Sequence, residues 1–335
     1  MISRSTLQKA VNENVIEAEQ LEALYAFFQN EKADAESNTD VDARDEPLKF
    51  IRSFGDVFIM LGIILLAIAV NRINFTGYEA IIPIAGFIVV AEWLVRVRRL
   101  ALPGIAILVS VLFFVTKATP PEYDISTMAG MAALGLTSLL FYLRYKMPFS
   151  LLPLMASLLA MTVIQIGLDI LETPIIFAVF GLIVFAVAMW FDSQDTKRIS
   201  HMSDSAFWLH LLAAPLIVHG VMASMLLSDS SWLSFVNKES VIFIFFAVFF
   251  LLALFVDRRA MLVSTQLYVI YALTQLFQDK LASTQDLMIY ILMAIGLFVI
   301  YFGAYWYKTR CLLFGFMSGT NISKYIPDLN LQDVK

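Results

Sequence analysis

Long uninterrupted runs of apolar residues constrain the fold of this chain more than any other feature. Each run is roughly 17–23 residues long, the length that an α-helix needs to cross about 30 Å of hydrocarbon. The run from Val241 to Val256 shows no alternation of apolar and polar residues, so it does not fit a strand of a membrane β-barrel. The sequence therefore predicts an all-α, polytopic bundle of transmembrane helices.

The number of spans follows from the charged and turn-rich breaks between these runs. The chain is 60% hydrophobic and only 15% charged, whereas a soluble chain is nearer half apolar and a quarter charged. About ten spans are predicted: 54–70, 78–95, 101–116, 127–143, 149–168, 174–191, 205–227, 240–256, 261–277 and 286–307. Short connections make sequential helices antiparallel neighbours.

The distribution of Lys and Arg predicts the orientation, because cytoplasmic loops are enriched in these residues. One set of loops holds nine: Arg96, Arg98, Arg99, Arg144, Lys146, Lys197, Arg198, Arg258 and Arg259. The alternate set holds four: Arg72, Lys117, Lys238 and Lys280. Ten spans with both termini in the cytoplasm are consistent with this bias.

The two ends of the chain are polar. Residues 1–48 carry eleven acidic and four basic side chains, so their net charge is 4 − 11 = −7. Residues 1–32 are predicted to form a cytosolic amphipathic helical module, and 33–47 an acidic disordered linker. The transmembrane bundle then covers 48–310, and 311–335 form an interfacial or cytosolic tail. The module either caps the bundle locally or binds a protein partner.

Few ionisable side chains lie at membrane depth, and each is a candidate functional residue because burial of charge is costly. His210 and His219 lie nine residues apart on span 205–227 and face opposite sides of a straight helix. With Cys311 as the only cysteine, no metal site and no cofactor are expected. Either the histidines hydrogen-bond to neighbouring groups, or they form a proton relay or pH-sensitive contact.

A second group of polar residues lies at the predicted outer ends of several spans. Its members are Gln165, Asp169, Glu172, His219, Thr274 and Gln275. Together they can line an outward-facing ligand cavity, although the sequence gives their depth and not their proximity. The alternative is that Asp169 and Glu172 simply end helices in a hydrated loop.

Small and aromatic residues suggest how the helices pack and where they meet the interface. Gly130, Gly135, Gly296 and Gly303 are predicted to allow close helix contacts. Seven aromatic residues near span ends are predicted to anchor the bundle at headgroup level: Trp93, Tyr142, Trp190, Trp208, Trp232, Tyr305 and Trp306.

The run from Val15 to Tyr25 carries the pattern Ile-x-x-x-Gln-x-x-x-Leu. It resembles the opening helix of a family of uncharacterised bacterial inner-membrane proteins, in which this pattern precedes a polar linker and a polytopic bundle. The segment Phe207–His219 and the Asp257-Arg-Arg-Ala turn are also similar to such proteins. The resemblance implies a bacterial inner-membrane location but no activity and no catalytic residue.

The function classes can be ranked from these features. Few charges inside the bundle argue against ion-coupled transport of a charged substrate, so the favoured hypothesis is binding or transport of a neutral or lipidic small molecule. The alternative is a scaffold or sensor that engages a partner through the acidic N-terminal module. An enzyme is least supported, since no nucleophile with its base is evident. The expected partners are the lipid bilayer and such a ligand or protein, with no nucleic acid.

Overall fold

A computed structural model describes most of the chain beyond residue 53. The described residues are 54–124, 126–167, 174–196, 200–227, 238–277 and 284–317, with 7, 8, 11, 13, 17, 20–22, 24 and 25 near the N-terminus. The chain divides into two compact units, Met1–Glu46 and Pro47–Lys335.

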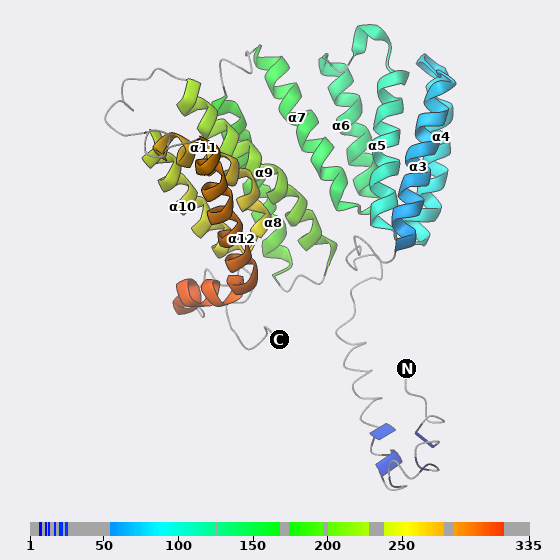
Figure 1. Ribbon diagram of the computed structural model, residues 1–335. Helices are drawn as coiled ribbons and strands as arrows, with labels where there is room; N and C mark the ends of the chain where they lie inside the picture. The colour runs from blue at the N-terminus through cyan, green and yellow to red at the C-terminus, as the bar shows by residue number, and fades with distance from the viewer. Residues whose placement is uncertain are drawn as a thin grey trace. The chain divides into compact units, whose positions relative to one another are not determined.

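The described part of the second unit consists of helices and the turns between them, with no strand (Figure 1). Its α-helices are α3 (Phe54–Arg72), α4 (Ile81–Ala91), α5 (Ala101–Ala118), α6 (Met128–Tyr145), α7 (Leu151–Ile166), α8 (Ile175–Gln194), α9 (His201–Leu227), α10 (Lys238–Val256), α11 (Val263–Phe277) and α12 (Thr284–Phe314). Shorter helical turns are η1 (Gly77–Ala80), η2 (Glu92–Val97), η3 (Pro121–Tyr123), η4 (Pro148–Ser150), η6 (Arg259–Leu262) and η7 (Gly315–Met317). The prediction of an all-α bundle is confirmed.

Each of the ten predicted spans coincides with one helical segment. Among the described residues, eight segments are long and apolar enough to cross a membrane, so this is a multi-pass membrane protein. The other two are α10, whose apolar part is limited to Ser240–Val256, and α11, which has 15 residues. A helix of 15 residues covers about 22 Å, less than the hydrocarbon core.

The first half-bundle, α3 to α6, is organised around α5. Ile107, Leu108, Val111 and Phe114 of α5 are each at most 1% exposed. Phe114 stacks on Phe87 of α4 with ring centroids 5.9 Å apart. Lipid tails are as apolar as these side chains, so van der Waals packing and not removal from water stabilises the contacts, and α5 is the core of this half.

The second half-bundle, α8 to α12, is organised around α9. A separate hydrophobic core runs along α9 and includes Leu209, Val218 and Met222, none of which is exposed. A Cβ added at Gly220 would lie 2.3 Å from the Ala178 backbone N, and one added at Gly181 would lie 2.8 Å from the Ile217 backbone N. Helices α8 and α9 therefore pack backbone against backbone, and any side chain at Gly181 or Gly220 would push them apart.

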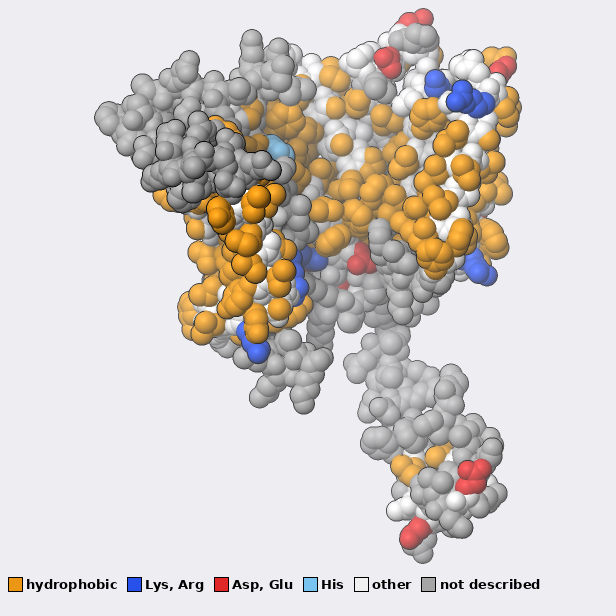
Figure 2. Space-filling model, in the orientation of Figure 1, with side chains coloured by type: hydrophobic (Ala, Val, Ile, Leu, Met, Phe, Trp, Pro, Cys, Tyr) orange, Lys and Arg blue, Asp and Glu red, His pale blue; other side chains and the backbone are white. Residues whose placement is uncertain are grey.

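The predicted glycine contacts have mixed outcomes. Gly135 of α6 faces Ser157 of α7, where an added Cβ would lie 3.3 Å from the serine Cβ. At Gly296 and Gly303 of α12, no described atom lies within 4 Å of such a Cβ. The apolar sides of α3 and α12 are largely exposed (Figure 2), as expected for helices that face lipid.

Three of the helix-to-helix returns at one end share a backbone geometry. Arg99, Lys146 and Asp257 each adopt a positive φ, of 54°, 52° and 59°. A left-handed residue ends a helix and reverses the chain. We refer to this end, where the returns before α5, α7 and α11 lie, as the basic end; it is the lower end in Figure 1.

Candidate functional site

Three ionisable side chains form a buried cluster at the basic end of the second half-bundle. His210 Nε2 of α9 lies 2.8 Å from Asp192 Oδ2 of α8, and Arg258 Nη2 donates a hydrogen bond to Asp192 Oδ1. Arg258 Nη2 also donates to the Ser203 carbonyl oxygen at 3.1 Å. The exposed fractions of Asp192, His210 and Arg258 are 2%, 1% and 7%. We call these three residues the buried clasp.

Local sequence explains how the clasp forms. Asp192 lies near the end of α8 and His210 lies 18 residues later, so the antiparallel pair α8 and α9 brings them to the same depth. The left-handed residue Asp257 ends α10 and turns Arg258 toward α8. The clasp therefore joins the consecutive helices α8 and α9 to the turn after α10, which lies 66 residues from Asp192.

The chemistry of the clasp is that of a structural ion pair. A buried carboxylate is costly unless it is paired and hydrogen-bonded, and Asp192 has partners on both oxygens. Within the described segments, no group of three or more His, Cys, Asp and Glu side chains is arranged to hold a metal ion. The two partners of Asp192 therefore give the clasp a role in stability.

A second set of buried polar contacts attaches α12 beside the clasp. Trp306 Nε1 donates to Asp257 Oδ1 at 2.6 Å, and Arg310 Nε donates to the Leu254 carbonyl oxygen at 3.0 Å. Helix α12 departs from helical geometry at Tyr305, and Figure 1 shows the segment after it turned from the preceding helix axis. Trp306 is only 1% exposed, so its prediction as an interfacial anchor is wrong.

The two histidines of α9 have separate partners. His210 belongs to the buried clasp, whereas His219 is exposed and its Nδ1 lies 2.6 Å from the Tyr268 hydroxyl of α11. Sequence spacing placed them on opposite faces, and the two environments differ accordingly.

The other predicted ligand residues do not form a described site. Gln165 is exposed near the end of α7, and the Thr274 hydroxyl donates to the Ile270 carbonyl oxygen of its own helix. Asp169, Glu172 and the side chain of Gln275 lie outside the described residues. The outward-facing cavity stays a prediction.

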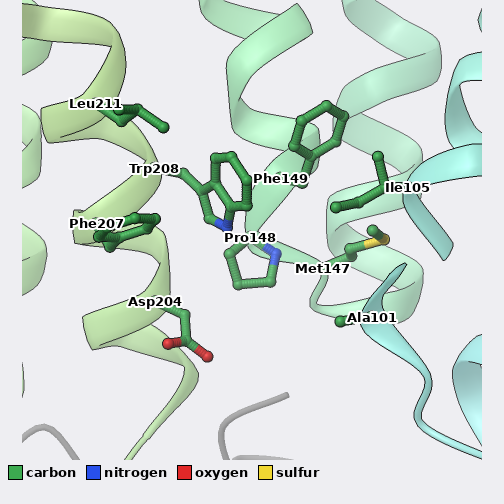
Figure 3. A pocket seen from close by; sticks show the side chains of 9 residues that line it. All are labelled: Ala101, Ile105, Met147, Pro148, Phe149, Asp204, Phe207, Trp208 and Leu211. Carbon is green, nitrogen blue, oxygen red and sulfur yellow. The ribbon is translucent and has the colours of Figure 1, made fainter. Parts of the chain in front are cut away.

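A cavity of 390 Å³ lies instead toward the basic end, between the two half-bundles (Figure 3). Helix α9 contributes one wall, and α5 with the turn η4 contributes the other. Its lining residues are Ala101, Ile105, Met147, Pro148, Phe149, Asp204, Phe207, Trp208 and Leu211. Its volume is within the range of small-molecule sites, about 300–1,000 Å³.

The cavity combines an apolar lining with a single carboxylate. Figure 3 shows Trp208 pointing toward Phe149 across the cavity and Asp204 at one end of it. The Trp208 and Phe149 rings meet edge to face with centroids 5.0 Å apart. Asp204 therefore supplies one charged, hydrogen-bonding group in an otherwise apolar pocket. Such an arrangement fixes the orientation of a bound ligand.

A second groove continues the apolar surface around α5. It has a volume of 480 Å³ and is lined by α3 and α5, including Ile64, Ile68, Val109 and Phe113. Ile105 lines both this groove and the cavity. Apolar surface thus extends from the junction of the half-bundles to the lipid-facing side of α3 and α5.

Sequence reasoning missed Asp192, Arg258 and Asp204 as candidate site residues. A signal for Asp204 exists, because Asp204, Trp208 and Leu211 recur at helical spacing and all three line the cavity. No equivalent signal predicts the clasp, which depends on the packing of α8, α9 and the turn after α10.

Comparison with known proteins adds no assignment to this geometry. No family model, no curated protein and no solved structure matches the chain.

Proposed function

We propose that this membrane protein binds, and moves across or along the bilayer, a neutral or lipidic small molecule. The observation that carries the proposal is the cavity between the half-bundles, apolar except for Asp204. An apolar pocket in a membrane bundle selects a ligand with a hydrocarbon portion, and a single acceptor selects a ligand with a hydroxyl, amide or amine donor.

The adjoining groove fits the same class of ligand. A molecule whose polar group hydrogen-bonds to Asp204 can extend a hydrocarbon chain past Ile105 toward α3. The junction between two separately packed cores is where relative motion of the halves alters access most easily, because few packed side chains need to rearrange there.

The test compares two leucine-to-tryptophan variants. Leu211→Trp fills the cavity, whereas Leu182→Trp places the same side chain at a position of α8 that is 57% exposed. Native mass spectrometry of protein extracted gently from its own membrane should find a retained small molecule or lipid on the wild type and on Leu182→Trp. Its loss on Leu211→Trp alone is expected; equal retention on all three proteins contradicts the proposal.

The resemblance of the run from Val15 to Tyr25 to a family of bacterial inner-membrane proteins supports a proposal for the location, and the distribution of Lys and Arg supports one for the orientation. We propose that the protein lies in the bacterial inner membrane with ten crossings and both termini in the cytoplasm. The excess of Lys and Arg in the loops at the basic end supports this orientation. A cysteine introduced at Lys146 should be protected from a membrane-impermeant thiol reagent in intact cells, and one at Arg72 should react.

A second function, partner binding by the N-terminal unit, has its own supporting observation. Leu7 and Leu21 are 8% and 6% exposed, so this acidic unit has an apolar interior of its own. The Gln20 side chain accepts a hydrogen bond from the Glu17 backbone N at 3.0 Å, which is one of the two hydrogen bonds of a capping box. Removal of residues 1–46 should abolish co-purification of a stoichiometric partner while the bundle keeps its thermal stability; unchanged co-purification contradicts this function.

A further inference from the structure

The basic end of the first half-bundle carries an exposed group of cationic and aromatic side chains. Five residues make up this arginine patch: Trp93, Arg96, Arg98, Arg144 and Lys146. All five are exposed. Even with Glu92 counted, the four cations and one carboxylate give a net charge of +3.

The backbone at the end of this span explains why the cations point outward. The helix widens into a π-helical turn over Glu92–Val97, and the Arg98 backbone N donates to the Trp93 carbonyl oxygen at 3.0 Å. Leu94 and Val95 are buried by this turn, at 4% and 2% exposure. Trp93, Arg96 and Arg98 consequently lie on the opposite, exposed side.

Glu92 holds part of the patch in a fixed geometry. Arg144 of α6 donates from Nε to Glu92 Oε1 at 2.9 Å and from Nη2 to Glu92 Oε2 at 3.0 Å. Arg96 Nη1 donates to Glu92 Oε2 at 3.1 Å. Both guanidinium groups are about half exposed, so the bridge orients them without covering them. Prepositioned arginines lose less side-chain entropy when they bind an anion.

Apolar side chains beside the cations indicate the kind of anion. Trp93 is 59% exposed and Val97 is 69% exposed, and the Arg98 guanidinium carbon lies 5.9 Å from the Trp93 ring centroid. An exposed tryptophan at the end of a span belongs at the level of lipid headgroups. Arginine is well suited to phosphate because its donors form a planar fork.

We infer that the arginine patch is a binding site for the phosphodiester headgroup of an anionic phospholipid. The lipid phosphate pairs with Arg98, Lys146 and the outward-facing donors of the bridged arginines, and its acyl chains lie against Trp93 and Val97. The site is distinct from the cavity at Asp204 and does not depend on the proposed function.

The test measures lipid selectivity on the intact protein in detergent micelles. Native mass spectrometry during titration with dioleoyl phosphatidylglycerol or dioleoyl phosphatidylcholine should find preferential binding of the anionic lipid to the wild type. Each basic residue near an anionic headgroup changes affinity about fivefold. Arg98→Gln with Lys146→Gln, which leaves the Glu92 bridge intact, should therefore lower phosphatidylglycerol affinity by about 25-fold.

The matched control changes two basic residues at the opposite end, Arg72→Gln with Lys117→Gln, and should keep the wild-type affinity. Glycerol phosphate, which carries the anion without acyl chains, should not displace the lipid. Equal binding of the two lipids by the wild type, an equal loss in the control, or displacement by glycerol phosphate would each overturn the inference.

Discussion

The two half-bundles use the same charge chemistry at the same end in opposite environments. In the first half, the Glu92–Arg144 bridge has side chains that are 35% and 50% exposed. In the second half, Asp192 and Arg258 of the buried clasp are 2% and 7% exposed. Exposed ion pairs contribute little to stability, whereas loss of one partner of a buried pair leaves an uncompensated charge. The comparison indicates that the first half keeps its charged side chains exposed at the basic end, whereas the second half buries them in contacts between its helices.

The largest expected effect comes from the clasp. Asp192→Asn should lower the free energy of unfolding by about 3–5 kcal/mol, because Arg258 is then buried without a counter-charge. Equilibrium unfolding in mixed detergent micelles measures this change. Replacement of the pair together, Asp192→Leu with Arg258→Met, should recover much of the loss. A decrease below about 1 kcal/mol in the single variant would show that the clasp is not structural.

The next effect tests the close packing of α8 and α9. Gly220→Ala should cost about 1–3 kcal/mol, since the new Cβ meets the Ala178 backbone and the helices must separate. Gly296→Ala on α12 is the matched control, where no described atom lies within 4 Å. It should be neutral or stabilise by up to about 1 kcal/mol. Similar losses in both variants would contradict the assignment of the glycine contact to α8 and α9.

The two histidines provide a smaller contrast within one helix. His219→Ala should cost about 0.5–1.5 kcal/mol through loss of the hydrogen bond with Tyr268. His210→Ala should cost more, because it also removes a buried partner of Asp192. Thermal unfolding of the two purified variants measures the order, and a reversed order would mean that His219 lies in a more important contact than His210.

The smallest effect is expected at the exposed bridge of the first half. Glu92→Gln should change the free energy of unfolding by about 0–1 kcal/mol, measured as for Asp192→Asn. A loss as large as that of Asp192→Asn would remove the distinction between the two halves.

Much of the fold was predictable because each membrane span is a continuous apolar run, which can be recognised without knowledge of its neighbours. Each of the ten predicted spans coincides with a helical segment in the described part of the chain, although only 15 residues of α11 are described. The buried position of Trp306 was not predictable, because it depends on the break in α12 and on Asp257, 49 residues away. The contact between Gly220 and Ala178 was missed for the same reason, since spacing within one helix does not identify its neighbour.

The candidate site was less predictable than the fold. His210 was identified as a candidate because it is ionisable at membrane depth, but its partners lie on other helices. The helical spacing of Asp204, Trp208 and Leu211 places them on one face of α9, but a carboxylate is also common in a first helical turn. The arrangement of α5, the turn η4 and α9 is needed to show that this face lines a cavity.

A lipidic ligand in the cavity between the half-bundles would be visible in a density map of the protein in its own membrane. Electron cryomicroscopy of the protein in nanodiscs made from its native membrane provides that map. We expect elongated density between Trp208 and Phe149 that reaches Asp204 at one end and passes Ile105 at the other. A map in which these side chains close the cavity, or in which it contains only water, would contradict this expectation.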